Sequence, residues 1–272
     1  MKPIAEDSKS QIAAVYDGAA ATYNRVGPSF FLYFGERLAS RAGIVPGSNV
    51  LDVATGTGAV LIPAAELAGV AGRVVGIDIS SRMIGRARTE ILKAGYGNSE
   101  VLVADGEHLP FPEASFDCVL CSFAIFLFSD LSGLISECHR VLRSSGRIGL
   151  AYSSGEDREW KWYEQLISRY RPTTCLGTER YSPQCVEAAL KDCGFTTVTT
   201  CVEAHRVVFE NADEFWDWSW SHGDRAVLES LTGSRSAFRW ELTEEFGRRT
   251  SSSGLRYQVS AALTLGTKQR AD

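Results

Sequence analysis

Short apolar runs alternate with helix-length segments along the middle of this 272-residue chain. The runs NVLDV, RVVGID, EVLVAD, FDCVLC and GRIGLAY have the composition of strands. Segments such as SSRMIGRARTEILKAG and LSGLISECHRVLR lie between them and have the length of helices. Strands joined through helices pair in parallel, and they are apolar throughout because helices cover both faces of the sheet. The pattern therefore predicts an α/β fold around a mostly parallel sheet.

Further helices and strands are predicted on both sides of this core. Residues 1–48 contain two helical patterns, and we expect them to form an N-terminal helical cap. Residues 49–152 hold the alternating core, and residues 153–272 contain a Trp-rich helical region, a strand, a second helical stretch and a last strand. We expect this third part to extend the cap and complete the sheet. Because 44% of the residues are hydrophobic, the chain can bury one sizeable core, so a single overall domain is expected.

The charge and the absence of long apolar runs narrow the choice of partners. A net charge of −5 provides no basic stripe of the kind that binds nucleic acid, so we expect no nucleic-acid partner. The N-terminal sequence MKPIAEDSKSQ lacks a hydrophobic signal core, and no apolar run is long enough for a membrane span. We therefore expect a cytoplasmic protein. The sequence leaves the oligomeric state open, including a homo-oligomer.

The seven cysteines are expected to be reduced thiols, since their number is odd and no secretory signal precedes them. Cys118 and Cys121 form a C-x-x-C, but they lie in a predicted strand, where residues three apart face opposite sides. The other cysteines never approach the spacing of a zinc site. We therefore predict no metal site.

The stretch VLDVATGTG places an acid and two glycines at the end of the first predicted strand. In doubly wound sheets, ligands bind beyond the carboxyl ends of the strands, where strand order reverses. Gly56 and Gly58 lack Cβ atoms where backbone must approach a ligand or adopt unusual dihedral angles. Packing of the following helix is an alternative reason for glycine here.

Acids lie at or just after the ends of three consecutive predicted strands, namely Asp52, Asp78 and Asp105. Asp78 follows Gly56 by 22 residues, a position suited to accepting both hydroxyls of a ribose. Three carboxylates near one crevice are unfavourable without polar partners. A ligand with hydroxyls, an amino group and an exocyclic amine would supply these partners.

The same loop favours S-adenosylmethionine over NAD. A dinucleotide site uses G-x-G-x-x-G, whose third glycine permits close packing of the helix that receives the pyrophosphate, but here Leu61 takes that place. Asp52 would repel phosphate, whereas it attracts the cationic amine and sulfonium of S-adenosylmethionine. An NAD-dependent oxidoreductase is kept as the third hypothesis.

The chain resembles the class I S-adenosylmethionine-dependent methyltransferases, in particular the small-molecule enzymes of ubiquinone and menaquinone biosynthesis. The resemblance runs from about Tyr16 to Tyr152 and is carried by YDGAAATY, VLDVATGTG, VVGIDIS, ADGEHLPFPEASFD and HRVLRSSGRIGL, in this order. It implies a Rossmann-like seven-stranded sheet with its last strand antiparallel, and a helical cap. Two departures are conservative: Ala54 replaces the first glycine of D-x-G-x-G-x-G, and Ser145 replaces a proline before the fifth strand.

The resemblance also implies which residues contact S-adenosylmethionine. It assigns the methionine part to Asp52, Ala54, Gly56 and Gly58. It assigns the ribose and adenine to Asp78, Ile79, Met83, Asp105, Gly106 and Glu107. Near the sulfonium it places Ser122 and Phe123, and Tyr23 closes over the cofactor.

Residues for the acceptor are harder to predict, because methyl transfer mainly requires alignment and exclusion of water. A base is needed only when the acceptor must lose a proton. His222, in WDWSWSHGDR, is the candidate catalytic base, since an imidazole suits proton removal at neutral pH. Trp218 and Tyr16 are the candidate substrate-binding residues, whereas His108 and His139 are expected to be structural.

The sequence thus predicts methyl transfer from S-adenosylmethionine to a small, largely apolar organic acceptor in biosynthesis of a metabolite or natural product. The alternative is a cyclase or isomerase of the same fold that binds the cofactor without transferring its methyl group. Whether oxygen, nitrogen or carbon is methylated stays open, because fold alone does not define the substrate.

Overall fold

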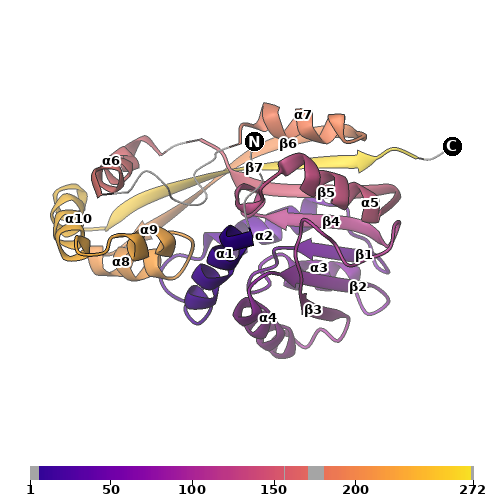
Figure 1. The fold of residues 1–272 in the computed structure, drawn as a ribbon, viewed down its shortest axis with the longest axis horizontal. Coiled ribbons are helices and arrows are strands. Elements are labelled where there is room, and N and C mark those ends of the chain that lie inside the picture. The colour runs from indigo at the N-terminus through magenta and orange to yellow at the C-terminus, as the bar shows by residue number, and fades with distance from the viewer. Residues whose placement is uncertain (1–5, 156, 171–180, 271–272) are drawn as a thin grey trace.

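A seven-stranded sheet forms the centre of the computed structural model, which describes residues 6–155, 157–170 and 181–270 (Figure 1). Across the sheet the strands follow the order β3-β2-β1-β4-β5-β7-β6. Their bounds are β1 Asn49–Val53, β2 Arg73–Asp78, β3 Ser99–Val103, β4 Phe116–Ser122, β5 Leu142–Ser153, β6 Phe195–Phe209 and β7 Leu255–Lys268.

Strands β1 to β5 are parallel, and β7 runs antiparallel to both of its neighbours, β5 and β6. The predicted α/β sheet with an antiparallel last strand is therefore confirmed. From β1 the order runs to β2 and β3 on one side and to β4 on the other, so strand order reverses at β1. The carboxyl ends of β1 and β4 consequently lie where doubly wound sheets bind their ligands.

Helices cover both faces of the sheet, with one buried apolar cluster on each face. One cluster includes side chains of α2, α3 and α4, and the other includes side chains of α5 and α7. The bounds are α2 Phe30–Arg41, α3 Leu61–Ala68, α4 Ser81–Ala94, α5 Leu131–Val141 and α7 Pro183–Asp192.

Local sequence explains where the core helices begin and end. The hydroxyl of Ser80 accepts a hydrogen bond from the backbone N–H of Met83 and caps the start of α4. Gly95 ends the same helix in the left-handed conformation, which glycine adopts without a Cβ penalty. Asp130 caps α5 by accepting from the N–H of Ser132. These caps hold the helices that follow β2 and β4 in register with the strand ends.

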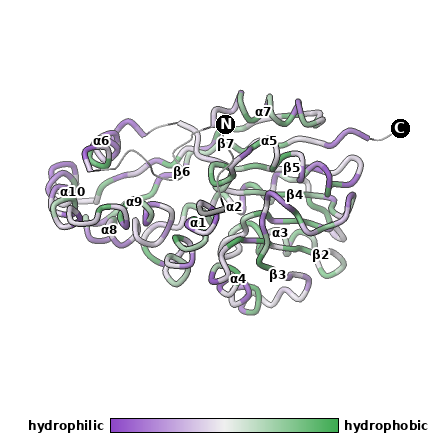
Figure 2. Tube along the Cα trace, viewed as in Figure 1, coloured by the Kyte–Doolittle hydropathy of each residue, from purple (hydrophilic) through white to green (hydrophobic). Residues whose placement is uncertain are grey.

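The alternation of side chains along β4 links the sheet to both clusters. Cys118 and Leu120 belong to one cluster, whereas Val119 and Cys121 belong to the other. The two cysteines of the C-x-x-C therefore face opposite sides of the sheet, as the strand periodicity predicts. Figure 2 shows hydrophobic residues concentrated in the central strands, which are buried on both faces.

The last two strands are long and carry a helical cap beyond the rest of the sheet (Figure 1). Two short 3₁₀ helices, η1 and η2, follow β4 and β5. The bounds of these remaining elements are α1 Glu6–Ala19, η1 Ile125–Leu127, η2 Arg158–Trp160, α6 Lys161–Tyr170, α8 Ala212–Trp220, α9 Arg225–Ser230 and α10 Arg235–Arg249.

Helix α1 lies between the cap and the core and is bonded to both. On the core side, Oδ1 of Asp17 accepts from the hydroxyl of Ser80 at 2.6 Å and from the N–H of Arg82 at 3.0 Å. On the cap side, Nη1 of Arg225 donates to the carbonyl oxygen of Gly18 at 3.0 Å. The N-terminal helix is thus fixed above the carboxyl ends of the strands.

Membrane-spanning helices, metal-binding clusters and disulfides are absent from the described residues. In the described part of the chain, no helix combines the length and apolarity needed to cross a membrane. Within the same ranges, no group of three or more His, Cys, Asp or Glu side chains is placed to hold a metal ion. The described cysteines are free thiols, and Cys175 lies outside the described residues.

Candidate active site

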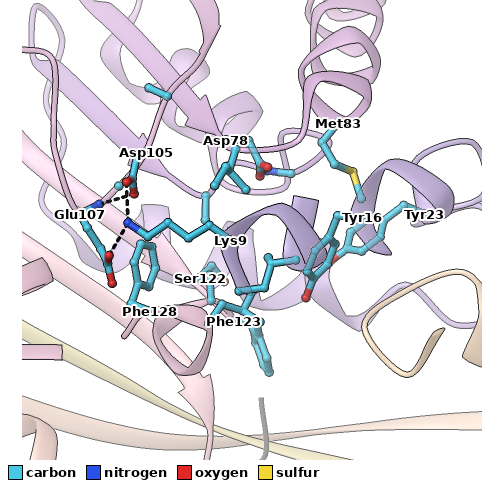
Figure 3. Close-up of a pocket in the computed structure, with 18 residues that line it drawn as sticks. Lys9, Tyr16, Tyr23, Asp78, Met83, Asp105, Glu107, Ser122, Phe123 and Phe128 are labelled. Carbon is cyan, nitrogen blue, oxygen red and sulfur yellow. Dashed lines mark hydrogen bonds and ion pairs between the residues drawn. The ribbon is translucent and has the colours of Figure 1, made fainter. Parts of the chain in front are cut away.

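Two adjoining cavities open at the carboxyl ends of the parallel strands. The first, which we name the cofactor cavity, contains all the residues predicted to contact the cofactor except Asp52 and Gly58 (Figure 3). Its lining is Lys9, Ile12, Tyr16, Tyr23, Ala54, Gly56, Asp78, Ile79, Met83, Ala104, Asp105, Gly106, Glu107, Ser122, Phe123, Ala124, Leu127 and Phe128. The second, which we name the acceptor chamber, has a volume of about 570 Å³ and reaches under the cap.

The loop after β1 presents bare backbone to the cofactor cavity. Ala54 and Gly56 both adopt the left-handed conformation, with φ of 56° and 54°. A Cβ on Gly56 would meet no atom within 4 Å, because the space beside it is the cavity itself. Leu61, which stands where a dinucleotide motif has its third glycine, packs instead against Gly76 of β2. The loop is therefore shaped for close approach of a ligand without the helix packing of an NAD site.

Asp52 lies behind this loop rather than in the cavity lining. Its side chain is buried, and Oδ2 accepts from the hydroxyl of Thr55 at 2.5 Å. Burial raises the pKa of Asp52 to about 7, although the bond from Thr55 opposes the shift. Gly58 also lies outside the lining. Asp52 thus anchors the loop, and a direct contact of either residue with the cofactor stays a prediction.

Asp78, at the end of β2, borders the cofactor cavity directly. Its Oδ2 accepts from the N–H of Gly56 at 2.9 Å, and its Oδ1 accepts from the N–H of Ser80 at 2.8 Å. Burial raises the pKa of Asp78 to about 6, and these two bonds oppose the shift. One carboxylate therefore ties the glycine loop to the start of α4 while its oxygens remain beside the cavity.

A lysine from α1 joins the acids that follow β3. Nζ of Lys9 lies 2.6 Å from Oδ2 of Asp105 and 2.5 Å from Oε2 of Glu107 (Figure 3). Partial burial opposes it, but Lys9 lowers the pKa of both carboxyl groups, so both remain ionised. The other carboxylate oxygen of Glu107 accepts from the backbone N–H of Ser129 at 2.6 Å. The sequence reasoning missed Lys9, because nothing in α1 marks its partners across the fold.

Aromatic side chains separate the two cavities. Tyr16, Tyr23 and Phe123 line both of them. Phe123 has a φ of 53° and is held there by a bond of 2.7 Å from its N–H to the carbonyl oxygen of Ala151. This left-handed conformation is unusual for a bulky residue and lies directly after β4, where a strained residue is held by the surrounding structure. Ile12 and Leu127 also line both cavities, so the passage between the cavities is bordered by these three rings and two aliphatic side chains.

Aromatic rings from distant parts of the chain form much of the wall of the acceptor chamber, which also includes the acids Asp157, Glu164 and Asp224. Trp218 faces this chamber, whereas Trp216 and Trp220 contact each other edge-on outside its lining. Arg235 and Arg239 cover those two rings from outside. The aromatic lining comprises Phe30, Phe31, Phe123, Phe126, Tyr16, Tyr23, Tyr152, Trp160, Tyr163, Tyr181, Phe215, Trp218 and Tyr257.

His222 follows α8 and borders the acceptor chamber. It is buried, and its ring packs on Trp218 with the centroids 3.9 Å apart. The other histidines lie outside both linings: His205 stacks on Tyr33, His139 packs edge-on against a phenylalanine, and His108 is exposed. His222 is thus the histidine that the fold places beside an acceptor.

Comparisons with known proteins identify the family. A family model described as a methyltransferase domain matches residues 50–146. Nocamycin O-methyltransferase of Saccharothrix syringae is 33% identical over 240 residues, which cover 82% of this chain and 86% of the relative. Aklanonic acid methyltransferase DauC of Streptomyces sp. strain C5 is 39% identical over 140 residues, 52% of this chain and 64% of the relative. The chain belongs to the class I S-adenosylmethionine-dependent methyltransferases.

Within that class, its relatives are small-molecule enzymes. The ubiquinone/menaquinone biosynthesis C-methyltransferase UbiE of Hahella chejuensis is 37% identical over 152 residues, 54% of this chain and 60% of the relative. Among solved structures, YcgJ of Bacillus subtilis covers 88% of this chain and 100% of its own, at a TM-score of 0.62 and 20% identity. The [4+2]-cyclase SpnF covers 97% of both chains, also at a TM-score of 0.62, with 17% identity. These two structures show the shared fold.

The protein is therefore an enzyme that methylates small molecules and uses S-adenosylmethionine as its cofactor. The chemistry of the cofactor cavity fits this molecule. Gly56 leaves room for the backbone of its methionine part, and Asp78 offers carboxylate oxygens for hydroxyl groups. Ile79, Leu127 and Phe128 add the apolar surface that an adenine ring requires.

Proposed function

We propose that this enzyme transfers the methyl group of S-adenosylmethionine to a hydroxyl oxygen of a largely apolar, ring-containing small molecule in biosynthesis of a metabolite or natural product. The observation that carries this proposal is the acceptor chamber, an aromatic-walled cavity that meets the cofactor cavity at Tyr16, Tyr23 and Phe123 and is bordered by His222. A volume of about 570 Å³ suits a molecule of several rings.

The residues predicted to contact the cofactor have proposed roles. The loop residues Ala54 and Gly56 receive the methionine part, and Asp52 holds the loop from behind. Asp78 accepts from the ribose hydroxyls, and Asp105 accepts from the adenine amine. The remaining proposed contacts are Tyr23, Gly58, Ile79, Met83, Gly106, Glu107, Ser122 and Phe123.

In this mechanism the chain mainly positions the acceptor and receives its proton. The bound cofactor supplies a methyl group already activated by its sulfonium. Phe123 and Trp218 hold the acceptor against the shared wall and exclude water, and alignment of this kind contributes about 7–11 kcal/mol in well-oriented reactions. Nε2 of His222 takes the hydroxyl proton, and Tyr16 contacts the acceptor at the passage between the cavities.

The relatives support oxygen as the methylated atom. The match to nocamycin O-methyltransferase spans 240 residues. The N-terminal part and the core together end at residue 152, so the similarity extends into residues 153–272, which hold most of the cap. The match to the C-methyltransferase UbiE spans 152 residues. Because cap residues wall the acceptor chamber, similarity there bears on the acceptor more directly than similarity in the core.

The proposal is tested by following an isotopic label. The enzyme is incubated with S-adenosylmethionine carrying a ¹³C-methyl group and a panel of hydroxylated polycyclic compounds, with hydroxyl-blocked versions as matched controls. We expect label on oxygen in the free hydroxyl compounds and none in the blocked ones. Label on carbon or nitrogen contradicts the proposed acceptor atom. A rearranged, unlabelled product supports instead a cyclase or isomerase, a chemistry known for the fold from SpnF.

A further inference from the structure

The two ring nitrogens of His222 have different surroundings. Nδ1 lies 2.7 Å from the backbone carbonyl oxygen of Trp218. Because a carbonyl oxygen can only accept a hydrogen bond, Nδ1 keeps its proton. In the neutral ring, Nε2 therefore carries the lone pair. This tautomer is the one that a base facing the acceptor chamber requires, since the second nitrogen orients the ring.

The nearest acid to Nε2 is Asp224, whose Oδ2 lies 3.7 Å away. The same oxygen lies 3.5 Å from the phenolic oxygen of Tyr163, on α6. Burial and the nearby charge of Asp224 both raise the pKa of Tyr163, so its hydroxyl keeps its proton and donates to the carboxylate. His222, Asp224 and Tyr163 all border the acceptor chamber.

Asp224 stands at a helix start but does not serve as a cap. It is the N-cap residue of α9, a position where aspartate usually accepts from a backbone N–H of the first turn. Here its side chain makes no cap hydrogen bond and points instead to His222 and Tyr163. Asp224 thus lacks the usual N-cap hydrogen bond and faces His222 instead. An aspartate with only a structural role would be expected to make the cap bond.

From this geometry we propose that Asp224 is the positioning residue of the base His222, and that Tyr163 fixes the Asp224 carboxylate. This inference rests on the proposed function. The acceptor's O–H proton moves to Nε2, its oxygen electron pair forms the new O–C bond, and the C–S bonding pair stays on sulfur, which becomes a neutral thioether. Asp224 stabilises the imidazolium formed in this step, as a carboxylate near a histidine does.

The other groups around His222 do not replace Asp224. From α1, the hydroxyl of Tyr16 lies near Gly223, but burial and then the charge of Asp78 raise its pKa, so it stays neutral. From α9, the guanidinium of Arg225 is bonded to Glu229 and to the carbonyl oxygen of Gly18. Phe31 of α2 supplies only an apolar ring. The charge that acts on Nε2 is therefore mainly that of Asp224.

The chain's four histidines make this inference accessible to NMR. Two-bond ¹H–¹⁵N spectra of the full-length enzyme give the tautomer of each ring and the chemical shift of each ring nitrogen, and the signals missing in His222→Ala assign His222. We expect the Nδ1–H tautomer in the wild type. Asp224→Asn should change the ¹⁵N chemical shift of Nε2 of His222, because the carboxylate charge beside this nitrogen is lost, and Tyr163→Phe should change it less. The matched control Asp213→Asn, in α8 but paired with Arg239, should leave it unchanged.

Two results overturn the inference: an Nε2–H tautomer in the wild type, or an Nε2 chemical shift of His222 that is the same in Asp224→Asn. The tautomer needs no variant, so the test survives an unstable mutant. With an acceptor from the labelling experiment, Asp224→Asn should lower kcat without changing the KM for S-adenosylmethionine, and Asp224→Glu should restore part of kcat. Methyl transfer with an unshifted His222 contradicts this inference alone, whereas a shifted His222 without transfer to oxygen contradicts the proposed function alone.

Discussion

The cofactor cavity and the acceptor chamber share a wall, yet they are built differently. The cofactor cavity is formed largely by loops that directly follow β1, β2, β3 and β4, with acids such as Asp78 and Asp105 at the strand ends. The acceptor chamber draws its rings from α1, α2, β5, α6, α8 and β7. The first depends on backbone shape and fixed carboxylates, and the second depends on side chains that meet only in the folded cap.

This difference teaches how each cavity should respond to change. A backbone cradle tolerates little alteration, because its dimensions are set by main-chain dihedral angles. A chamber of side chains can lose one ring and keep the rest. We therefore expect large losses of binding from single changes in the cofactor cavity and graded, acceptor-specific losses from changes in the chamber.

The largest effect is expected from Gly56→Val. The branched side chain would enter the cofactor cavity and should abolish S-adenosylhomocysteine binding in calorimetry. Gly95→Val is the matched control, because Gly95 also has a positive φ, of 74°, and open space beside it, but lies at the end of α4 outside the lining. Both variants carry backbone strain of about 1–2 kcal/mol. Normal binding by Gly56→Val would falsify the proposed role of the loop.

The next effect is expected from Asp78→Ala. Loss of a charged acceptor for the ribose hydroxyls should weaken S-adenosylhomocysteine by about 1.5–3 kcal/mol, roughly tenfold to a hundredfold. Asp117→Ala is the control, since Asp117 also accepts from a backbone N–H but lies near the opposite end of β4. Equal affinities for the two folded variants would show that Asp78 serves only the loop.

A smaller effect is expected from pH. Cofactor hydroxyls need the ionised form of Asp78, whose pKa burial raises to about 6, so affinity for S-adenosylhomocysteine should fall about fivefold between pH 6 and pH 5. Without ligand, the stability of the fold should change with pH in the opposite direction, because Asp52 and Asp78 are buried more favourably when protonated. Their folded pKa values of about 7 and 6 exceed the usual value of 3.8, so this stability is full below pH 4 and is lost as pH rises through 6 to 7.

Calorimetry at several pH values checks the affinity, and chemical denaturation checks the stability. The stability difference between wild type and Asp78→Ala isolates the contribution of Asp78 from that of other groups. An affinity that stays flat from pH 5 to pH 8 contradicts a carboxylate contact at Asp78.

The smallest effect is expected in the chamber, from Trp218→Ala. Loss of one ring from the wall should raise the KM for the acceptor about three- to tenfold while affinity for the cofactor stays the same. Trp216→Ala, on another face of α8 and equally buried, is the matched control for lost stability. If the two variants change the KM for the acceptor equally, Trp218 does not contact the acceptor.

The sequence was sufficient for the strands and for most of the cofactor cavity because that information is local. Asp78 is the last residue of β2 and Asp105 follows β3 by two residues, and the parallel sheet brings these strand ends together. The orientation of Asp52 was not predictable, since its partner Thr55 and its depth behind the loop depend on the turn. For the same reason, the packing of Phe128 against Gly106 could not be read from the chain.

The cap was predictable only in outline. The crowded segment FWDWSWSH indicated an aromatic wall, and Trp218 does line the chamber. Trp160 joins it from η2, whereas Trp162 lies outside the lining. Asp224 could have been proposed from its place two residues after His222, whereas nothing in the sequence connects Tyr163 with either residue. Contacts across many residues depend on the lengths of β6 and β7, which periodicity does not give.

The ion pairs of Lys9 have a consequence for how the enzyme takes up its cofactor. Oδ2 of Asp105 already accepts from Lys9 at 2.6 Å and lies 3.2 Å from Nδ1 of His108, so an adenine amine that uses this oxygen competes with these groups. The N-terminal helix and the cofactor then act as rivals for a single acceptor atom. Salt weakens such a rival by screening its charge, so added salt should ease cofactor entry until screening is complete.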